Sequence, residues 1–157
     1  MPDSPEAVPL AELLGALRAV LRDVAELIEE QGSVAARAYV LPDVTGARMT
    51  MVTMATGSPH ARQHSLQRVR ETVTELEAAL VVWVLETWQP VDGDQQLNLV
   101  GEVETRAGLI FRLQAPIGED EAGASCLDCE AALASLGVYA GAPLIACAWP
   151  REDPDPR

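Results

Sequence analysis

The segment from Ser58 to Pro90 constrains the fold most, because an amphipathic helix pattern runs directly into a strongly apolar strand pattern. Ser58 can cap a helix with its hydroxyl, and Pro59 suits the first helical position because its missing N–H would have no partner there. Apolar side chains then recur at helical spacings of three and four: Leu66, Val69, Val73, Leu76 and Leu80. The sequence therefore predicts a long helix that begins at Ser58.

The apolar period changes to two near Ala79, which predicts the start of a strand. Both sides of this strand are largely apolar: Val81, Trp83, Leu85 and Thr87 lie on one side, and Val82, Val84, Glu86 and Trp88 on the other. Such a pattern is typical of a central strand that is covered on both faces. Full burial of one such side chain contributes roughly 1.5–3 kcal/mol, so we expect this strand at the centre of the core.

A first amphipathic helix is predicted from Leu10 to about Gln31, where Gly32 can end it. Its apolar stripe is wide: Leu10, Leu13, Leu14, Leu17, Leu21, Val24, Leu27 and Ile28. Since two long helices compete for the faces of one sheet, we expect part of this stripe to stay exposed and to mediate self-association. The interface candidates are Leu13, Leu17, Leu21 and Val24.

Two hairpins flank the central pair. Strands over residues 34–41 and 47–55, joined by a four-residue loop at 43–46, would place Ala38 opposite Met51. Strands over residues 97–105 and 109–117 follow an exposed loop at 89–96. A three-residue loop at 106–108 would place Val103 opposite Phe111 and Glu102 opposite Arg112, which keeps each face consistent.

The C-terminal part is predicted as a mobile acidic loop over residues 118–125, a short helix over 126–136 and a last strand over 143–149. Residues 1–9 form a flexible acidic leader and residues 150–157 a disordered tail, so residues 10–149 make one domain. The fold class is α+β, with helices on one mostly antiparallel sheet. The order of the first eight elements is similar to that of roadblock and longin-type scaffolds, which serve as platforms for other proteins. The similarity is one of element order only.

Charge limits the classes of partner. The chain has 24 acidic and 11 basic residues, a formal net charge of −13, and every basic residue in that count is arginine. Such a charge disfavours direct binding to nucleic acid or to an anionic membrane. The acidic N-terminus is unlike a signal peptide and three cysteines do not form a paired framework, so we expect a cytoplasmic protein.

The thiols and imidazoles give the most pointed candidates for metal or redox chemistry. Cys126 and Cys129 have a C-x-x-C spacing that suits a disulfide or half of a zinc site, but Asp128 between them opposes thiolate formation. The remaining weak ligand candidates are Cys147, His60 and His64. Since this ligand set is incomplete, we expect the thiols to pack as small apolar side chains and the histidines to be exposed and without a functional role. We expect no bound metal or cofactor.

Glu86 is a carboxylate inside the most apolar strand, so we expect it to be the most buried carboxylate of the chain. Burial would raise its pKa, as in a general acid or base, which makes it a weak catalytic candidate. The alternative is a structural carboxylate that is hydrogen-bonded or paired with an arginine such as Arg112. Glu102 and Glu104 are interpreted as part of a solvated strand face.

No phosphate-binding loop, nucleophile elbow, dinucleotide fingerprint or EF-hand loop is present. We therefore expect a non-catalytic protein that works through protein–protein contact as an assembly or scaffold protein, with itself as one partner. One alternative is a small thiol- or metal-dependent protein or enzyme that uses Cys126 and Cys129 with Glu86. The other is an acidic decoy for a nucleic-acid-binding protein.

Overall fold

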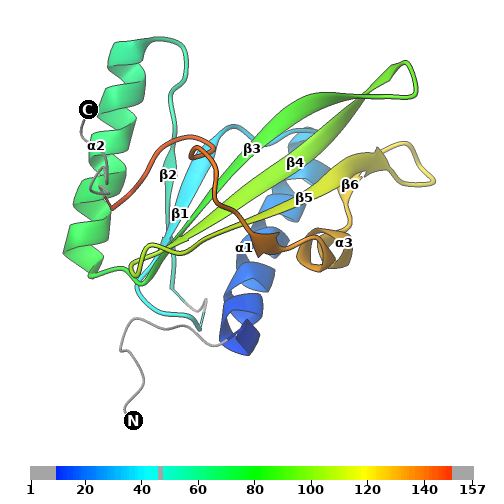
Figure 1. The fold of residues 1–157 in the computed structure, drawn as a ribbon. Helices are drawn as coiled ribbons and strands as arrows, with labels where there is room; N and C mark the ends of the chain where they lie inside the picture. The colour runs from blue at the N-terminus through cyan, green and yellow to red at the C-terminus, as the bar shows by residue number, and fades with distance from the viewer. Residues whose placement is uncertain (1–9, 46–47, 150–157) are drawn as a thin grey trace.

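The computed structural model describes residues 10–45 and 48–149, which fold around one antiparallel sheet (Figure 1). The elements are α1 (Leu10–Gln31), β1 (Arg37–Leu41), β2 (Thr50–Thr53), α2 (Pro59–Leu76), β3 (Leu80–Val91), β4 (Asp94–Thr105), β5 (Ile110–Glu119), β6 (Ser125–Leu127), α3 (Cys129–Ala134) and β7 (Gly137–Val138). The described strands lie in the order β2-β1-β3-β4-β5-β6, and β7 also pairs with β5. The predicted α+β class is confirmed. The leader at 1–9 and the tail at 150–157 lie outside the described residues.

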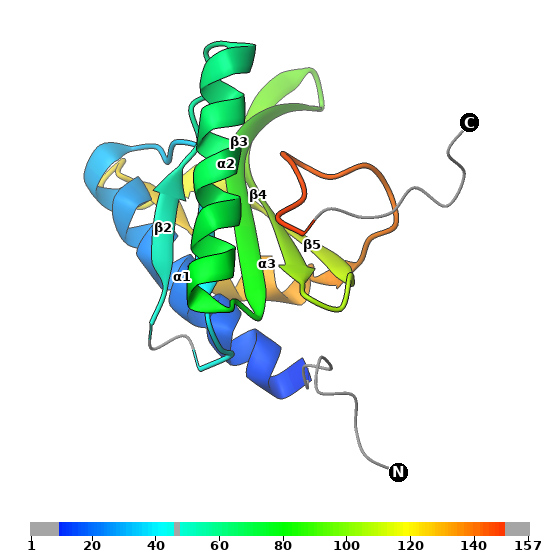
Figure 2. The same cartoon turned by 90° about the vertical axis from the view of Figure 1, so that its left-hand side faces the viewer.

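Helices cover both faces of the sheet (Figure 2). α1 and α3 pack on one face, where Leu17, Val82 and Leu133 belong to the same buried cluster. α2 packs on the other face, where Val69 joins Val40 and Trp83. α2 starts as predicted, because the Ser58 side chain accepts a hydrogen bond from the Ala61 N–H.

α1 is buried against the chain's own sheet. Leu13, Leu17, Leu21 and Val24 each expose at most 2% of their surface. The two long helices do not compete, because each takes a different face of the sheet. The expectation that these four residues form an interface between copies is therefore wrong.

β3 and β4 form a much longer hairpin than the sequence interpretation allowed. The turn holds only Asp92 and Gly93, with φ values of 49° and 86°. Two successive residues with positive φ are typical of a type I′ turn, which matches the twist of the flanking strands. The exposed loop predicted at 89–96 is therefore wrong, since most of it is strand.

The two predicted registers have different outcomes. β4 and β5 pair as predicted, with Val103 opposite Phe111 and Glu102 opposite Arg112, and Gly108 takes a φ of 92° in the turn. In the first hairpin Ala38 lies opposite Val52, one residue away from the predicted partner. Burial decides this register, because the shift places Val52 in the core beneath α2.

The C-terminal part departs most from the prediction. Residues 125–127 form a strand that pairs with β5, so Cys126 is not in a helix, and α3 begins only at Cys129. Residues 143–149 form no strand. They belong to an irregular segment, residues 139–149, which we call the strap; it crosses the sheet from β7 towards α2 (Figure 1). Its first residue, Tyr139, donates a backbone hydrogen bond to the Ile110 carbonyl of β5 at 2.9 Å, and side chains bind the backbone further along, as shown below.

Candidate functional site

The most buried carboxylates lie on β4, beneath the strap. Glu102 is 1% exposed and Glu104 is 2% exposed, whereas Glu86 is only partly buried. Both the solvated face predicted for Glu102 and Glu104 and the greatest burial predicted for Glu86 are therefore wrong. Glu102 and Glu104 do lie on the same face of β4, as the alternation predicts. The strap, which is distant in sequence, buries that face, and the local sequence pattern does not predict this.

Each of these carboxylates accepts hydrogen bonds from the strap backbone. One oxygen of Glu102 accepts from the Arg112 Nε at 2.9 Å and from the Leu144 N–H at 3.0 Å. Glu104 accepts from the Trp83 indole at 3.2 Å, from the Ala148 N–H at 2.7 Å and from the Trp149 N–H at 3.3 Å. The carboxylates thus replace the strand partner that the strap lacks.

Arginines bind the carbonyls of the same segment. Arg70 donates two hydrogen bonds to the Cys147 carbonyl at 3.2 and 3.0 Å, and Arg62 donates to the Ile145 carbonyl. Arg112 donates to the Ala142 carbonyl at 3.0 Å, and its guanidinium lies 3.7 Å from the centre of the Tyr139 ring. The charged groups that could have formed a catalytic centre are therefore used to hold the chain's own backbone.

One atom in this network has no hydrogen bond among the described residues, the Oε1 of Glu102. The other oxygen of the same carboxylate has two donors, one of them in the Arg112 ion pair. In the part of the chain that the structure describes, this carboxylate belongs to no group of three His, Cys, Asp or Glu side chains that could hold a metal ion. The Glu102 carboxylate therefore binds Arg112 and the strap through one oxygen, and its other oxygen is buried.

Glu86 acts at the base of the β3–β4 hairpin. Its Oε1 accepts a hydrogen bond from the Val34 N–H at 2.5 Å, so it holds the segment between α1 and β1. The arginine proposed as its partner, Arg112, pairs instead with Glu102. The structural alternative stated for Glu86 describes the contact it makes, with a backbone N–H in place of an arginine.

The two thiols of the C-x-x-C motif lie on different elements, Cys126 in β6 and Cys129 at the start of α3. Burial raises the pKa of the Cys129 thiol, and the neighbouring charges of Asp128 and Glu130 raise it further. The Cys129 thiol also lies 3.6 Å from the Leu21 carbonyl, to which it donates. These features describe a thiol held in its neutral form, the opposite of an activated one.

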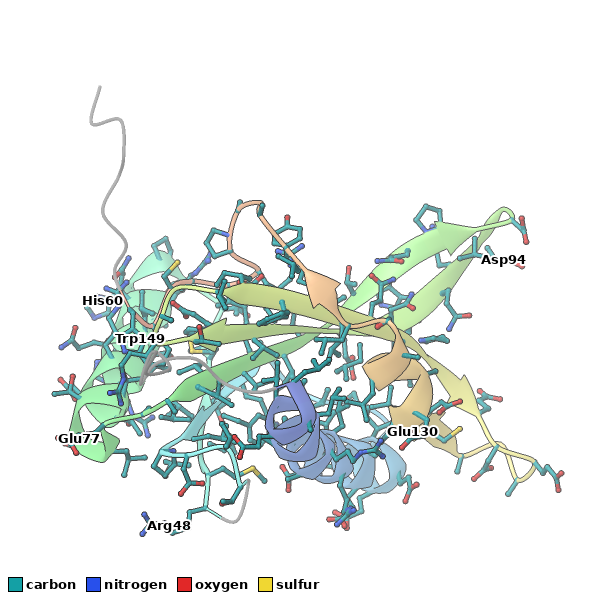
Figure 3. The ribbon with its side chains drawn as sticks, turned by 60° about the horizontal axis from the view of Figure 1, so that its bottom comes forward. Arg48, His60, Glu77, Asp94, Glu130 and Trp149 are labelled. Carbon is teal, nitrogen blue, oxygen red and sulfur yellow. The ribbon has the colours of Figure 1, made fainter. Side chains whose placement is uncertain are left out.

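The other metal-ligand candidates are not brought together. His60 and His64 are both exposed on α2, and Cys147 is in the strap. Figure 3 shows His60 far from Glu130, the neighbour of Cys129. Within residues 10–45 and 48–149, no group of three His, Cys, Asp or Glu side chains is placed to hold a metal ion.

A second region of interest is the outer part of the β3–β4 hairpin, residues 85–97, which we call the arm. β1 pairs with β3 only as far as Val84, and β5 pairs with β4 only from Asn98. The arm strands therefore pair only with each other in the described sheet, and the arm projects beyond the helices (Figures 1 and 3).

The arm carries exposed apolar side chains. Trp88 is 63% exposed and Val91 is 48% exposed, and their odd spacing places them on opposite faces of the ribbon. The sequence interpretation placed Trp88 in the core strand and missed its exposure. The Asp92-Gly93 dipeptide was the available signal, because a hairpin turn there moves Trp88 towards the tip.

None of the described helices contains a stretch that is long and apolar enough to span a lipid bilayer. No protein-family model, curated protein or solved structure matches this chain.

Proposed function

We propose that this is a non-catalytic protein that acts by binding another protein, and that the arm is its recognition surface. The observation that carries the proposal is the exposure of Trp88, at 63%, on a hairpin that extends past both helical layers. Tryptophan is among the residues most enriched at the energetic centres of protein interfaces. A large aromatic ring in water on a projecting element is therefore typical of a contact residue.

The geometry of the arm supports the same conclusion. A two-stranded ribbon alone is marginally stable in water, and this one has no third strand over residues 85–91 and 94–97 in the described sheet. A partner that covers Trp88 would order the ribbon and bury apolar surface in the same step. Only the base of the arm, at Leu85 and Leu97, packs against the chain's own core, and the fully buried part of β3 ends at Val84.

Charge favours a partner with a basic surface. The arm contains Glu86, Asp92 and Asp94 and no basic residue, on a chain whose net charge is −13. Complementary charge around an apolar contact steers the encounter and disfavours wrong partners. A second copy of the acidic arm would be a poor partner for this surface.

Site-specific photocrosslinking tests the proposal. A photoreactive amino acid replaces Trp88 in the full-length chain in its source cells, and the matched control carries it at Leu109, which is 52% exposed in the β4–β5 turn. We expect a discrete crosslinked product at position 88, of a mass other than twice that of the chain, and none at position 109. No discrete product at 88, or the same product at both positions, would contradict the proposal.

Once the crosslinked protein is identified, Trp88→Ala should weaken its binding by about 30-fold or more, the loss expected for a central aromatic contact. Leu109→Ala is the matched control and should leave the affinity within about threefold. Equal effects of the two substitutions would show that the arm is not the recognition surface.

A further inference from the structure

We propose that a second copy of this chain binds along the free edge of β2 and the adjoining flank of α2, so that two sheets become one. This surface lies at the edge strand, apart from the arm, and the inference does not depend on the proposed function. It rests on two features, an unprotected strand edge and an unusual charge order on α2.

β2 is the edge strand at one end of the described sheet. Thr50, Met51 and Thr53 are exposed, Met51 to 42%. The segment over residues 49–57, Met-Thr-Met-Val-Thr-Met-Ala-Thr-Gly, contains no charged residue and no proline, in a chain that is 22% charged. Natural edge strands usually prevent pairing with another chain by being very short or by carrying charge, proline or a bulge. β2 is short, at four residues, but it has neither charge nor proline to prevent pairing, and this leaves the edge suited to pair.

The charge order on α2 opposes the helix dipole. Three arginines precede three glutamates along the helix and its cap: Arg62, Arg68 and Arg70, then Glu71, Glu75 and Glu77. Acidic groups are stabilising at the N-terminus of a helix and basic groups at the C-terminus, so this order costs stability in the isolated chain. An antiparallel copy of the same helix would place the basic half of each beside the acidic half of the other.

One flank of α2 faces the β2 edge. The Ser65 hydroxyl accepts a hydrogen bond at 2.9 Å from the N–H of Ala55, which follows β2. Arg68, Thr72 and Glu75 follow Ser65 at spacings of three and four, so they continue along the same flank. Arg62 and Arg70 point elsewhere, because they bind the strap.

Arg68 and Glu75 are the charged members of this flank. Both are exposed, and neither forms an ion pair with another residue in the described part of the chain. They are seven residues apart and so cannot reach each other as an i, i+4 pair does. Glu71 is within i, i+3 reach of Arg68 but accepts a hydrogen bond from Gln67, so the charges of Arg68 and Glu75 remain available to a second helix.

A two-fold axis satisfies both features at once. Antiparallel pairing of β2 with β2 of the second copy continues the sheet and leaves both α2 helices on the same face, running in opposite directions. Arg68 of each copy then faces Glu75 of the other, twice per dimer. The net charge of −13 opposes approach, but the paired edge is itself uncharged and salt screens charges beyond about 8 Å.

Sedimentation equilibrium on the full-length chain tests this, with a charge exchange as the central comparison. We expect a dimer at about 50 µM chain, and we expect Arg68→Glu and Glu75→Arg each to weaken it about tenfold, because each places like charges together twice. The double exchange should restore the affinity to within about threefold. General repulsion predicts otherwise: Arg68→Glu adds negative charge and should weaken association, whereas Glu75→Arg removes it and should strengthen association.

The strand edge is tested by Met51→Lys, which should weaken the dimer by about tenfold or more because it places a charge on the pairing edge. Leu109→Lys, at a similarly exposed position, is the matched control and should have no effect; circular dichroism verifies that each variant is folded. The inference would be overturned by a wild-type chain that is monomeric at about 50 µM, or by opposite effects of the two single charge reversals. It would equally be overturned if the double exchange did not recover the affinity, or if the two lysine substitutions had equal effects. Trp88→Ala should leave the dimer unchanged, so this inference and the role of the arm can fail separately.

Discussion

Trp83 and Trp88 lie in the same strand, five residues apart, in opposite environments. Trp83 is fully buried, with α2 above it and a hydrogen bond from its indole to Glu104, whereas Trp88 is 63% exposed on the arm. The strand's own sequence does not produce this difference, because the apolar pattern continues from Leu80 to Trp88. The cover comes from distant segments, α1, α2 and the strap, whose clusters reach the base of the arm at Leu85 and Leu97 but do not include Trp88. A region that the fold leaves bare on an otherwise covered strand is available for a partner.

The largest expected effect on the free energy of unfolding comes from replacing each of the two tryptophans in turn. Trp83→Ala should lower the free energy of unfolding by about 3–5 kcal/mol, because it opens a cavity in the core and removes a donor to Glu104. Trp88→Ala should change it by less than about 0.5 kcal/mol, as expected for an exposed side chain. Urea denaturation followed by circular dichroism measures both. Similar losses would show that the arm packs as part of the core.

The second test compares two carboxylates. Glu104→Ala should cost about 3 kcal/mol, because it leaves the Ala148 and Trp149 N–H groups and the Trp83 indole without their buried acceptor. Glu86→Ala, at the base of the arm, should cost about 1 kcal/mol, because it removes one contact from a partly exposed side chain. The same denaturation experiment applies. A Glu104→Ala variant as stable as wild type would mean that the strap is not held as described.

The third test uses pH. Burial raises the pKa of Tyr39 above its ordinary value of 10.0, and the hydrogen bond that its hydroxyl donates to Asp23 raises it further. A raised folded-state pKa contributes stability that is complete below the unfolded pKa and is lost as pH rises towards the folded one. Above pH 10 the unfolded chain releases this proton first, so stability should fall by about 1.4 kcal/mol per pH unit from this group. Tyr39→Phe should remove that part of the slope between pH 10 and 11, and an unchanged slope would contradict it.

The smallest expected effect concerns the turn of the arm. Gly93 has a φ of 86° with nothing within 4 Å of an added Cβ, so Gly93→Ala tests backbone strain alone. It should cost about 1–2 kcal/mol locally. Because the turn of the arm lies away from the core, the global free energy of unfolding should fall by less than the local cost. Hydrogen exchange of the arm amides, compared with those of β1, should show the loss confined to the arm.

Much of the fold follows from local patterns. The 3.6-residue period of Leu10–Gln31 and the turn chemistry of residues 106–108 predicted α1 and the β4–β5 register, because both depend on neighbours in sequence. The burial of Glu102 and Glu104 could not be predicted in this way. It depends on residues 144–149, some forty positions further along the chain. Their apolar run predicts a strand, and nothing in it indicates that their backbone N–H groups bind the two carboxylates.

The Arg68–Glu75 flank of α2 could be predicted only in part from the sequence. The helix and its charges are evident in the sequence, but the side that faces β2 becomes known only from the Ser65–Ala55 contact. Exposure of Trp88 depended similarly on where β1 and β5 stop pairing, which no periodicity encodes.

The way the strap is held also determines how freely its sequence can drift. Glu102, Glu104, Arg62, Arg70 and Arg112 bind main-chain groups, which every residue type supplies alike. Side-chain identity is constrained at Gly141, where an added Cβ would meet the Tyr139 ring, and at Ile145 and Ala148, which are buried, while Leu144, Ala146 and Cys147 are only partly covered. Proline is the exception, because it lacks the N–H that positions 139, 144, 148 and 149 donate. Over many generations the partly covered positions of this segment should therefore accept varied residues, with proline excluded at the four positions that donate an N–H.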